Sequence, residues 1–172
     1  FKMKRLVLTL LLCSATSASF AADIQCQTKK YDAYIDASLN WYQDLINLTS
    51  QQFPELNEVG NWFYQGRKHH FELNREAVKF YLVEDSSKVA TEQPVEGWLK
   101  LEQKDIKTLA SRSDNLGKLA SESFSDRQSA PHPKNYELRS AFADLLSHPN
   151  KIDGALKKYN QAITVAEQIS CP

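Results

Sequence analysis

Apolar residues recur every three or four positions along most of this chain, and no sustained alternation of apolar and polar residues occurs. The first such repeat covers residues 23–53 and predicts an amphipathic helix with one apolar face. Pro54 follows, and because proline suits the first turn of a helix, we expect a corner there and a second helix over residues 54–84. The main stripe positions are Tyr31, Ile35, Leu39, Tyr42 and Ile46 in the first repeat, and Val59, Phe63, Gly66, His70, Leu73, Ala77 and Phe80 or Tyr81 in the second.

The next apolar repeat predicts a third helix over residues 94–124, with Pro94 in its first turn. Gly117 interrupts this repeat, and glycine costs about 1 kcal/mol relative to alanine inside a helix. A bend is therefore expected at Gly117. Residues 125–133 contain two prolines separated by a histidine, a pattern that stops a helix and predicts a linker.

The remaining repeats predict a short helix over residues 136–146 and a last helix that Asn150 caps and that ends near Ile169. The predicted fold class is therefore all-α. The four long predicted helices favour an up-down-up-down four-helix bundle. If the extra short helix ran antiparallel to the others as a fifth helix of the bundle, the first and last helices would no longer run in opposite directions. We therefore expect it to cross the end or side of the bundle.

The first residues of the chain have the pattern of a secretory signal peptide. Met3, Lys4 and Arg5 form a basic start, an apolar run follows, and Ser19 and Ala21 supply the small side chains that signal peptidase requires. We predict that residues 1–21 are cleaved and that residues 22–172 form a single helical domain. The apolar run is much shorter than the roughly 20 residues that span a bilayer, which argues against a membrane anchor.

Charge and composition narrow the possible partners. The formal charge of the chain is 0, and loss of residues 1–21 would remove three basic residues and no acidic one, leaving a formal charge of −3. A mildly acidic chain without basic blocks is not expected to bind nucleic acid or an anionic membrane surface. No membrane insertion is expected after cleavage, and the predicted location is the periplasm or the extracellular space.

Two cysteines, Cys26 and Cys171, would remain after cleavage. An even pair in an exported protein predicts a disulfide. In the predicted bundle the start of the first helix and the end of the last lie at the same end, so one bridge could join them. Two free, buried thiols are the alternative.

Motifs for metal, cofactor or catalytic chemistry are weak. His69 and His70 are adjacent, so on a helix their side chains point about 100° apart and would not share one metal. The sequences HExxH, ExxH, CxxCH and GxSxG do not occur. No metal, cofactor or catalytic residue is therefore predicted, and enzymatic activity is not expected.

A ligand pocket is one interpretation of the second helix. His70 lies on the apolar stripe one turn after Gly66, and a small residue there would leave room for the imidazole. Phe63, His70 and Tyr81 would line such a pocket, and replacing Gly66 by leucine would overpack it. The alternative is a histidine of the core boundary that bonds to a neighbouring helix.

A protein-binding surface is the other interpretation. Trp41, Trp62 and Tyr64 belong to runs of adjacent aromatic residues, so some of these rings must leave the core, and Arg67 is nearby. Exposed Trp, Tyr and Arg side chains are typical of binding hot spots. The alternative is an aromatic-rich boundary of the helical core.

These observations predict an exported, non-enzymatic protein-binding module of the bacterial periplasm, such as an inhibitor, an immunity factor or an accessory subunit. The alternative is a small-molecule-binding or sensing helical bundle with a pocket near His70.

Overall fold

The computed structural model describes residues 14–172, and all regular secondary structure in this range is helical. The predicted basic start and the apolar run of the signal peptide lie outside the described residues. The α-helices are α1 Ser14–Gln52, α2 Asn57–Glu84, α3 Gln103–Ala110, α4 Asn115–Gln128, α5 Asn135–Leu146 and α6 Pro149–Glu167, and the short 3₁₀ helices are η1 Pro54–Leu56, η2 Ser86–Lys88 and η3 Val95–Gly97.

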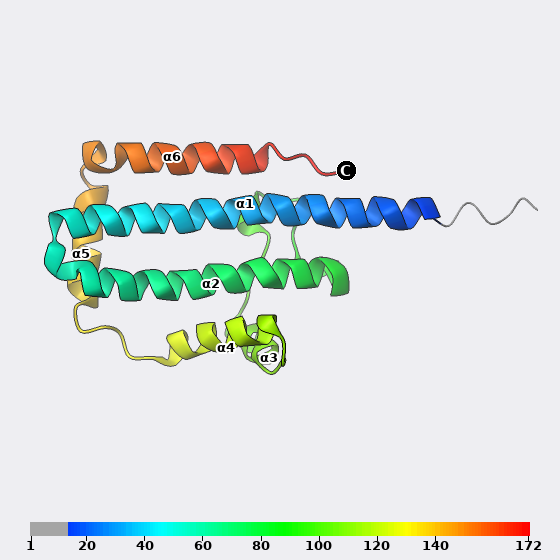
Figure 1. The fold of residues 1–172 in the computed structure, drawn as a ribbon, viewed down its shortest axis with the longest axis horizontal. Coiled ribbons are helices and arrows are strands. Elements are labelled where there is room, and N and C mark those ends of the chain that lie inside the picture. The colour runs from blue at the N-terminus through cyan, green and yellow to red at the C-terminus, as the bar shows by residue number, and fades with distance from the viewer. Residues whose placement is uncertain (1–13) are drawn as a thin grey trace, which may run out of the picture.

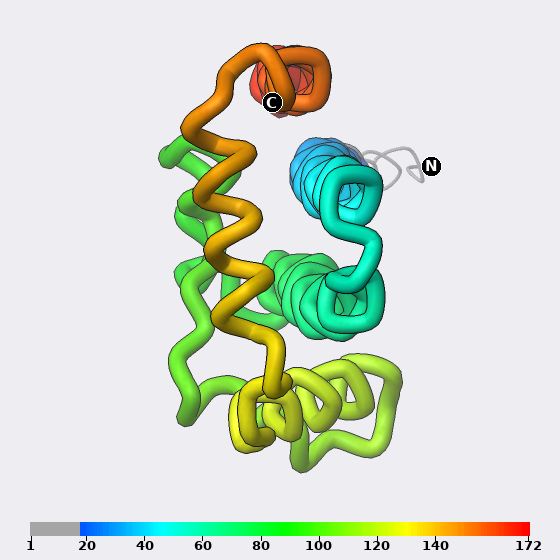
Figure 2. The backbone as a smooth tube through the Cα atoms, turned by 90° about the vertical axis from the view of Figure 1, so that its left-hand side faces the viewer, coloured from blue at the N-terminus to red at the C-terminus, as the bar shows by residue number. Residues whose placement is uncertain are grey.

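Four of these helices form a single layer in the order α6, α1, α2, α4, and neighbours in the layer run in opposite directions (Figure 1). The short helix α5 crosses the end of the layer, as predicted (Figure 1). Figure 2 shows that the chain between α2 and α3 crosses on the same side of the layer as α5. The all-α class is therefore confirmed, but α4 and α6 lie at opposite edges, and a closed four-helix bundle is not confirmed.

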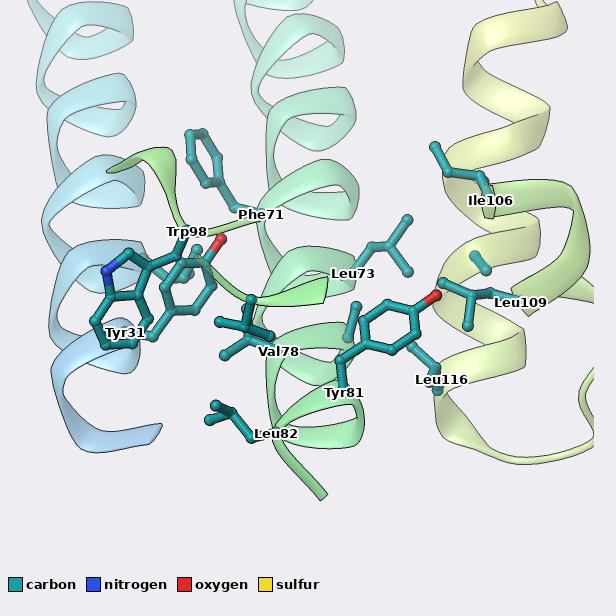
Figure 3. Close-up of a cluster of buried hydrophobic side chains, with 14 of the residues drawn as sticks. Tyr31, Phe71, Leu73, Val78, Tyr81, Leu82, Trp98, Ile106, Leu109 and Leu116 are labelled. Carbon is teal, nitrogen blue, oxygen red and sulfur yellow. The ribbon is translucent and has the colours of Figure 1, made fainter. Parts of the chain in front are cut away.

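The crossing segment, residues 89–102, explains why the layer stays open. Val89, Val95 and Trp98 of this segment are buried in the main core. The Trp98 ring stacks on Tyr31 of α1 with 5.9 Å between ring centroids, and its indole N–H donates to the carbonyl oxygen of Gln93. Irregular chain thus covers apolar surface of α1 and α2 that another helix would cover in a closed bundle (Figure 3).

The predicted helix over residues 94–124 is wrong. It is divided into η3, an extended stretch, α3 and α4. Glu102 and Asp105 form a reciprocal capping box that starts α3. Asp114 accepts a 3.0 Å hydrogen bond from the N–H of Gly117 and starts α4. Each cap satisfies backbone donors at a new helix start, so one continuous helix does not form.

The second helix and the end of the first agree closely with the prediction, but α1 begins at Ser14, before the predicted start at residue 23. The last helix differs in detail. It begins at Pro149, so Asn150 lies inside its first turn and does not cap it. Leu156 is 38% exposed although its side chain is apolar. Only Ile152 and Ala166 of α6 are fully buried, because α6 lies at an edge of the layer and contacts α1 on one side only.

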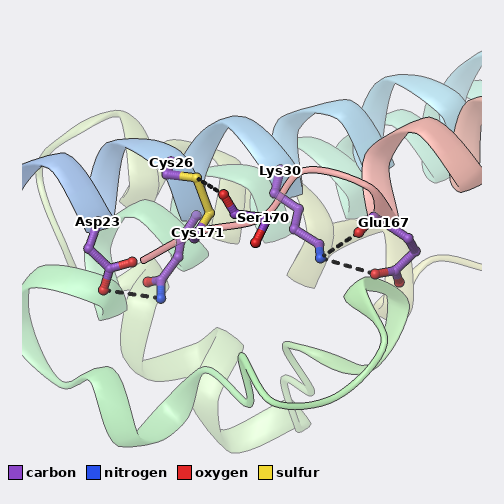
Figure 4. The surroundings of a disulfide bond; sticks show 7 residues. Asp23, Cys26, Lys30, Glu167, Ser170 and Cys171 are labelled. Atoms are coloured by element: carbon purple, nitrogen blue, oxygen red, sulfur yellow. Dashed lines mark hydrogen bonds and ion pairs between the residues drawn. A yellow bond between two sulfur atoms is a disulfide. The ribbon is translucent and has the colours of Figure 1, made fainter.

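The predicted bridge between Cys26 and Cys171 is confirmed. Cys26 lies in α1 shortly after the predicted cleavage point, and Cys171 follows the end of α6 (Figure 4). The bridge therefore fastens the edge helix α6 to α1. A disulfide is compatible with an oxidising compartment.

Candidate functional site

The three predicted pocket residues do not share one pocket. Phe63 and Tyr81 lie on the same face of α2, but 18 residues of helix at 1.5 Å each separate their backbones by about 27 Å. Phe63 packs against Phe142 of α5, with ring centroids 5.2 Å apart. Tyr81 is only 8% exposed and belongs to the main core beside α3 and α4 (Figure 3).

His70 lies between them and is mostly buried. Burial, together with the positive charges of Arg67 and Arg127, lowers its pKa from the usual 6.5 to about 4. Its Nε2 is 3.5 Å from the side-chain nitrogen of Asn74. The imidazole is therefore neutral at neutral pH, and within residues 14–172 neither arginine forms an ion pair with a carboxylate.

The expected close packing at Gly66 is wrong. A Cβ atom built on Gly66 meets no atom within 4 Å. The glycine therefore does not reserve space for the imidazole, and the sequence argument for a pocket at this point fails.

Arg67 packs against aromatic rings and is not exposed as the predicted protein-binding residue. Its guanidinium lies 4.8 Å from the ring centroid of Tyr42 and 5.2 Å from that of Phe71. Its Nε is buried without a hydrogen-bond partner. Since Tyr42 also contacts Phe63 at 5.9 Å, the structure does bring Phe63 and Arg67 into one cluster.

The four predicted interaction residues do not form one exposed surface. Trp41 packs against Tyr159 of α6 with ring centroids 5.7 Å apart, and Tyr64 is half-buried. Trp62, by contrast, is 40% exposed and lies against the ring of His132, 5.6 Å between centroids. Only Trp62 therefore matches the expected exposure.

A different surface combines exposed aromatic and apolar side chains. A groove of about 500 Å³, here called the η1–α5 groove, lies between the corner that joins α1 to α2 and one face of α5. Its apolar floor consists of Phe53, Leu56 and Ala141, which belong to a small core cluster. The other lining residues are Glu55, Lys134, Tyr136, Glu137, Ser140 and Asp144.

Tyr136 is the most exposed large aromatic residue of this lining, with 79% of its surface accessible. His132 and Trp62 lie near the groove. The backbone N–H of Lys134 donates to Nδ1 of His132, whose ring contacts Trp62, and the amine of Lys134 donates to the carbonyl oxygen of Glu55. An aromatic side chain left open beside an apolar floor gains burial when a partner covers it.

The groove carries an excess of negative charge. Three carboxylates and one ammonium group line it, a formal charge of −2. Asp144 is engaged by Gln52 at 3.2 Å and by Lys151 at 3.5 Å. Glu55 and Glu137 form no ion pair within the described part of the chain. Their charges are available to a partner.

Sequence reasoning missed Tyr136 and the groove. Tyr136 has no aromatic neighbour along the chain, and Phe53 lies at the end of the first apolar repeat, next to the corner expected at Pro54. The two sides of the groove are about 80 residues apart in sequence, and they become neighbours only in the folded structure.

Over residues 14–172, no group of three or more His, Cys, Asp or Glu side chains is placed to hold a metal ion. The same part of the chain contains no helix with the length and apolar character needed to cross a bilayer. No protein-family model matches the chain, and comparisons with curated proteins and with solved structures found no similar protein. Its function therefore has to be inferred from its own residues.

Proposed function

We propose that this chain is an exported, non-enzymatic protein-binding module of the bacterial periplasm, and that its partner docks in the η1–α5 groove. The observation that carries the proposal is Tyr136, 79% exposed over an apolar floor. Large aromatic side chains that sit beside such a floor are typical binding hot spots. The roles that fit are an inhibitor, an immunity factor or an accessory subunit.

Export is supported by the basic and apolar start of the sequence and by the small residues Ser19 and Ala21. The bridge between Cys26 and Cys171 is compatible with an oxidising compartment. Mass spectrometry of the protein recovered from the periplasm should find a chain that begins at Ala22. A chain that retains residues 1–21 would contradict this part of the proposal.

The binding role is tested by affinity capture with two matched variants. Tyr136→Asp places a charge in the groove, whereas Val83→Asp places the same charge at a residue 60% exposed near the opposite end of α2. The partner should be lost with Tyr136→Asp and retained with Val83→Asp. Equal capture by both variants, or no capture by the unaltered protein, would contradict the proposal.

A second candidate is a small anionic ligand beside Arg67 and His70. It is favoured by one observation: neither Arg67 nor Arg127 forms an ion pair within residues 14–172, although both influence His70. An anion bound beside His70 would offset the positive charge of both arginines. Inorganic phosphate or small carboxylates should raise the melting temperature of the unaltered protein but not of Arg67→Gln, and an equal shift in both would remove this candidate.

A further inference from the structure

We infer that the partner element which enters the η1–α5 groove is an amphipathic helix with lysine or arginine residues beside its apolar stripe. This inference rests on the proposed protein-binding role and specifies the chemistry of the partner. It is carried by the shape of the groove, by its floor and by its uncompensated charge.

The shape of the groove fits a helix. Its α5 wall consists of residues 136, 137, 140, 141 and 144, which are spaced as one face of a helix over about two turns, or roughly 12 Å. The opposite wall is the short η1 corner. A second helix laid along α5 would place its own i, i+3, i+4 and i+7 side chains over this length.

An extended peptide has no comparable site. Peptides that bind as strands pair their backbone with the free edge of a β-sheet. All regular secondary structure in the part of the chain that the structure describes is helical, so such a peptide would leave its backbone donors and acceptors unpaired over the apolar floor.

The apolar floor and the acidic lining residues indicate which side chains the partner helix should carry. Leu56 and Ala141 are buried in the small core cluster beneath the groove, and Phe53 packs against the same cluster, so the stripe facing them must be apolar. Glu55 and Glu137 belong to the lining, and neither has an ion-pair partner among residues 14–172. Basic residues flanking the apolar stripe would pair with them, whereas acidic residues would be repelled.

The test uses two fluorescent helical peptides of about 16 residues with the same leucine stripe, one flanked by lysines and one by glutamates. Binding to the full chain is measured by fluorescence anisotropy. The lysine peptide should bind, and the glutamate peptide should bind at least about tenfold more weakly. Raising the salt concentration from about 0.05 M to about 0.5 M should weaken binding of the lysine peptide, because salt screens the attraction between its lysines and the acidic groove.

Two double variants assign the effect to the groove. Glu55→Gln with Glu137→Gln should lower the affinity for the lysine peptide about fivefold. Glu84→Gln with Glu92→Gln removes the same charge from exposed acids elsewhere, and should leave binding unchanged. Both sets replace exposed side chains, and circular dichroism checks that the fold is intact.

The outcomes separate this inference from the proposed function. Equal binding of the two peptides, no binding of either, or an equal loss in both double variants would overturn the basic helix. If the Tyr136→Asp variant still loses the natural partner while neither peptide binds, the binding role stands and only the basic helix is rejected. If Tyr136→Asp has no effect on capture, the proposed function itself fails.

Discussion

The carboxylate of Glu167 accepts a 2.6 Å hydrogen bond from the backbone N–H of Val95, a residue 72 positions earlier in the chain. Its other oxygen lies 3.1 Å from the amine of Lys30 on α1 (Figure 4). The Glu167 side chain at the end of α6 therefore bonds to both the crossing segment and α1. Burial alone would raise the pKa of Glu167, but the Val95 N–H and Lys30 together hold it below its usual value.

Glu167→Ala should destabilise the protein by about 1 kcal/mol, since a hydrogen bond to a charged group is lost from a partly exposed site. Chemical denaturation measures the change, and Glu92→Ala at an exposed, unpaired acid is the control. Because the pKa of Glu167 is lowered by folding, its contribution is present above the usual carboxyl pKa and is lost as the pH falls below it. A difference between the two variants that persists at low pH would contradict this assignment.

The bridge between Cys26 and Cys171 closes a loop with a sequence separation of 145. On the chain-entropy model its removal should cost up to about 5 kcal/mol. Thiol titration of the denatured, non-reduced protein should find neither of these cysteines free. Cys26→Ser with Cys171→Ser should then unfold at a lower temperature, and α6 should lose its amide protection before α2 because it is an edge helix. Simultaneous loss of protection in α6 and α2 would contradict this order.

Two glycines should respond in opposite directions to the same substitution. A Cβ at Gly66 meets open space, so Gly66→Ala should stabilise by up to about 1 kcal/mol through helix propensity. A Cβ at Gly117 would overlap the carbonyl oxygen of Arg112, so Gly117→Ala should destabilise by about 1–3 kcal/mol through overpacking. Thermal unfolding of both variants checks the pair. A destabilised Gly66→Ala would restore the sequence-based expectation of close packing there.

Stability should depend on the titration of His70. Its folded pKa of about 4 lies below the usual value of 6.5, so the unfolded chain binds the proton more readily between these values. Stability should fall by about 2–3 kcal/mol as the pH is lowered from about 6.5 to about 4. His70→Gln should remove this slope. His148→Gln, at an exposed histidine, should retain it. Equal slopes in both variants would show that His70 is not the group responsible.

The sequence was sufficient to predict the helices whose apolar residues recur with a regular helical period. The long helices α1 and α2 were predicted because their stripes are long and Pro54 marks the corner between them. The pairing of Cys26 with Cys171 followed from the small number of cysteines and from the position of each near one end of the domain. In these cases the information is local or depends on very few residues.

Other features depend on contacts between distant segments. Val95 and Trp98 are three residues apart, a spacing that imitates a helical stripe, although the stretch that follows them is extended and crosses α1 and α2. The break before α4 depends on a cap at Asp114 that competes with helix continuation. The η1–α5 groove could not be predicted, because only the folded chain brings Phe53 and Leu56 next to Tyr136 and Ala141.

The docking surface is tested most directly by site-specific photocrosslinking in the cells that produce the protein. A photoreactive phenylalanine analogue replaces Tyr136, and in a matched protein it replaces Val83, an exposed residue near the opposite end of α2. Light should join position 136, and not position 83, to one partner of defined mass, and the yield should fall when Glu55→Gln and Glu137→Gln are added. The same adduct from position 83, or none from position 136, would contradict docking in the η1–α5 groove.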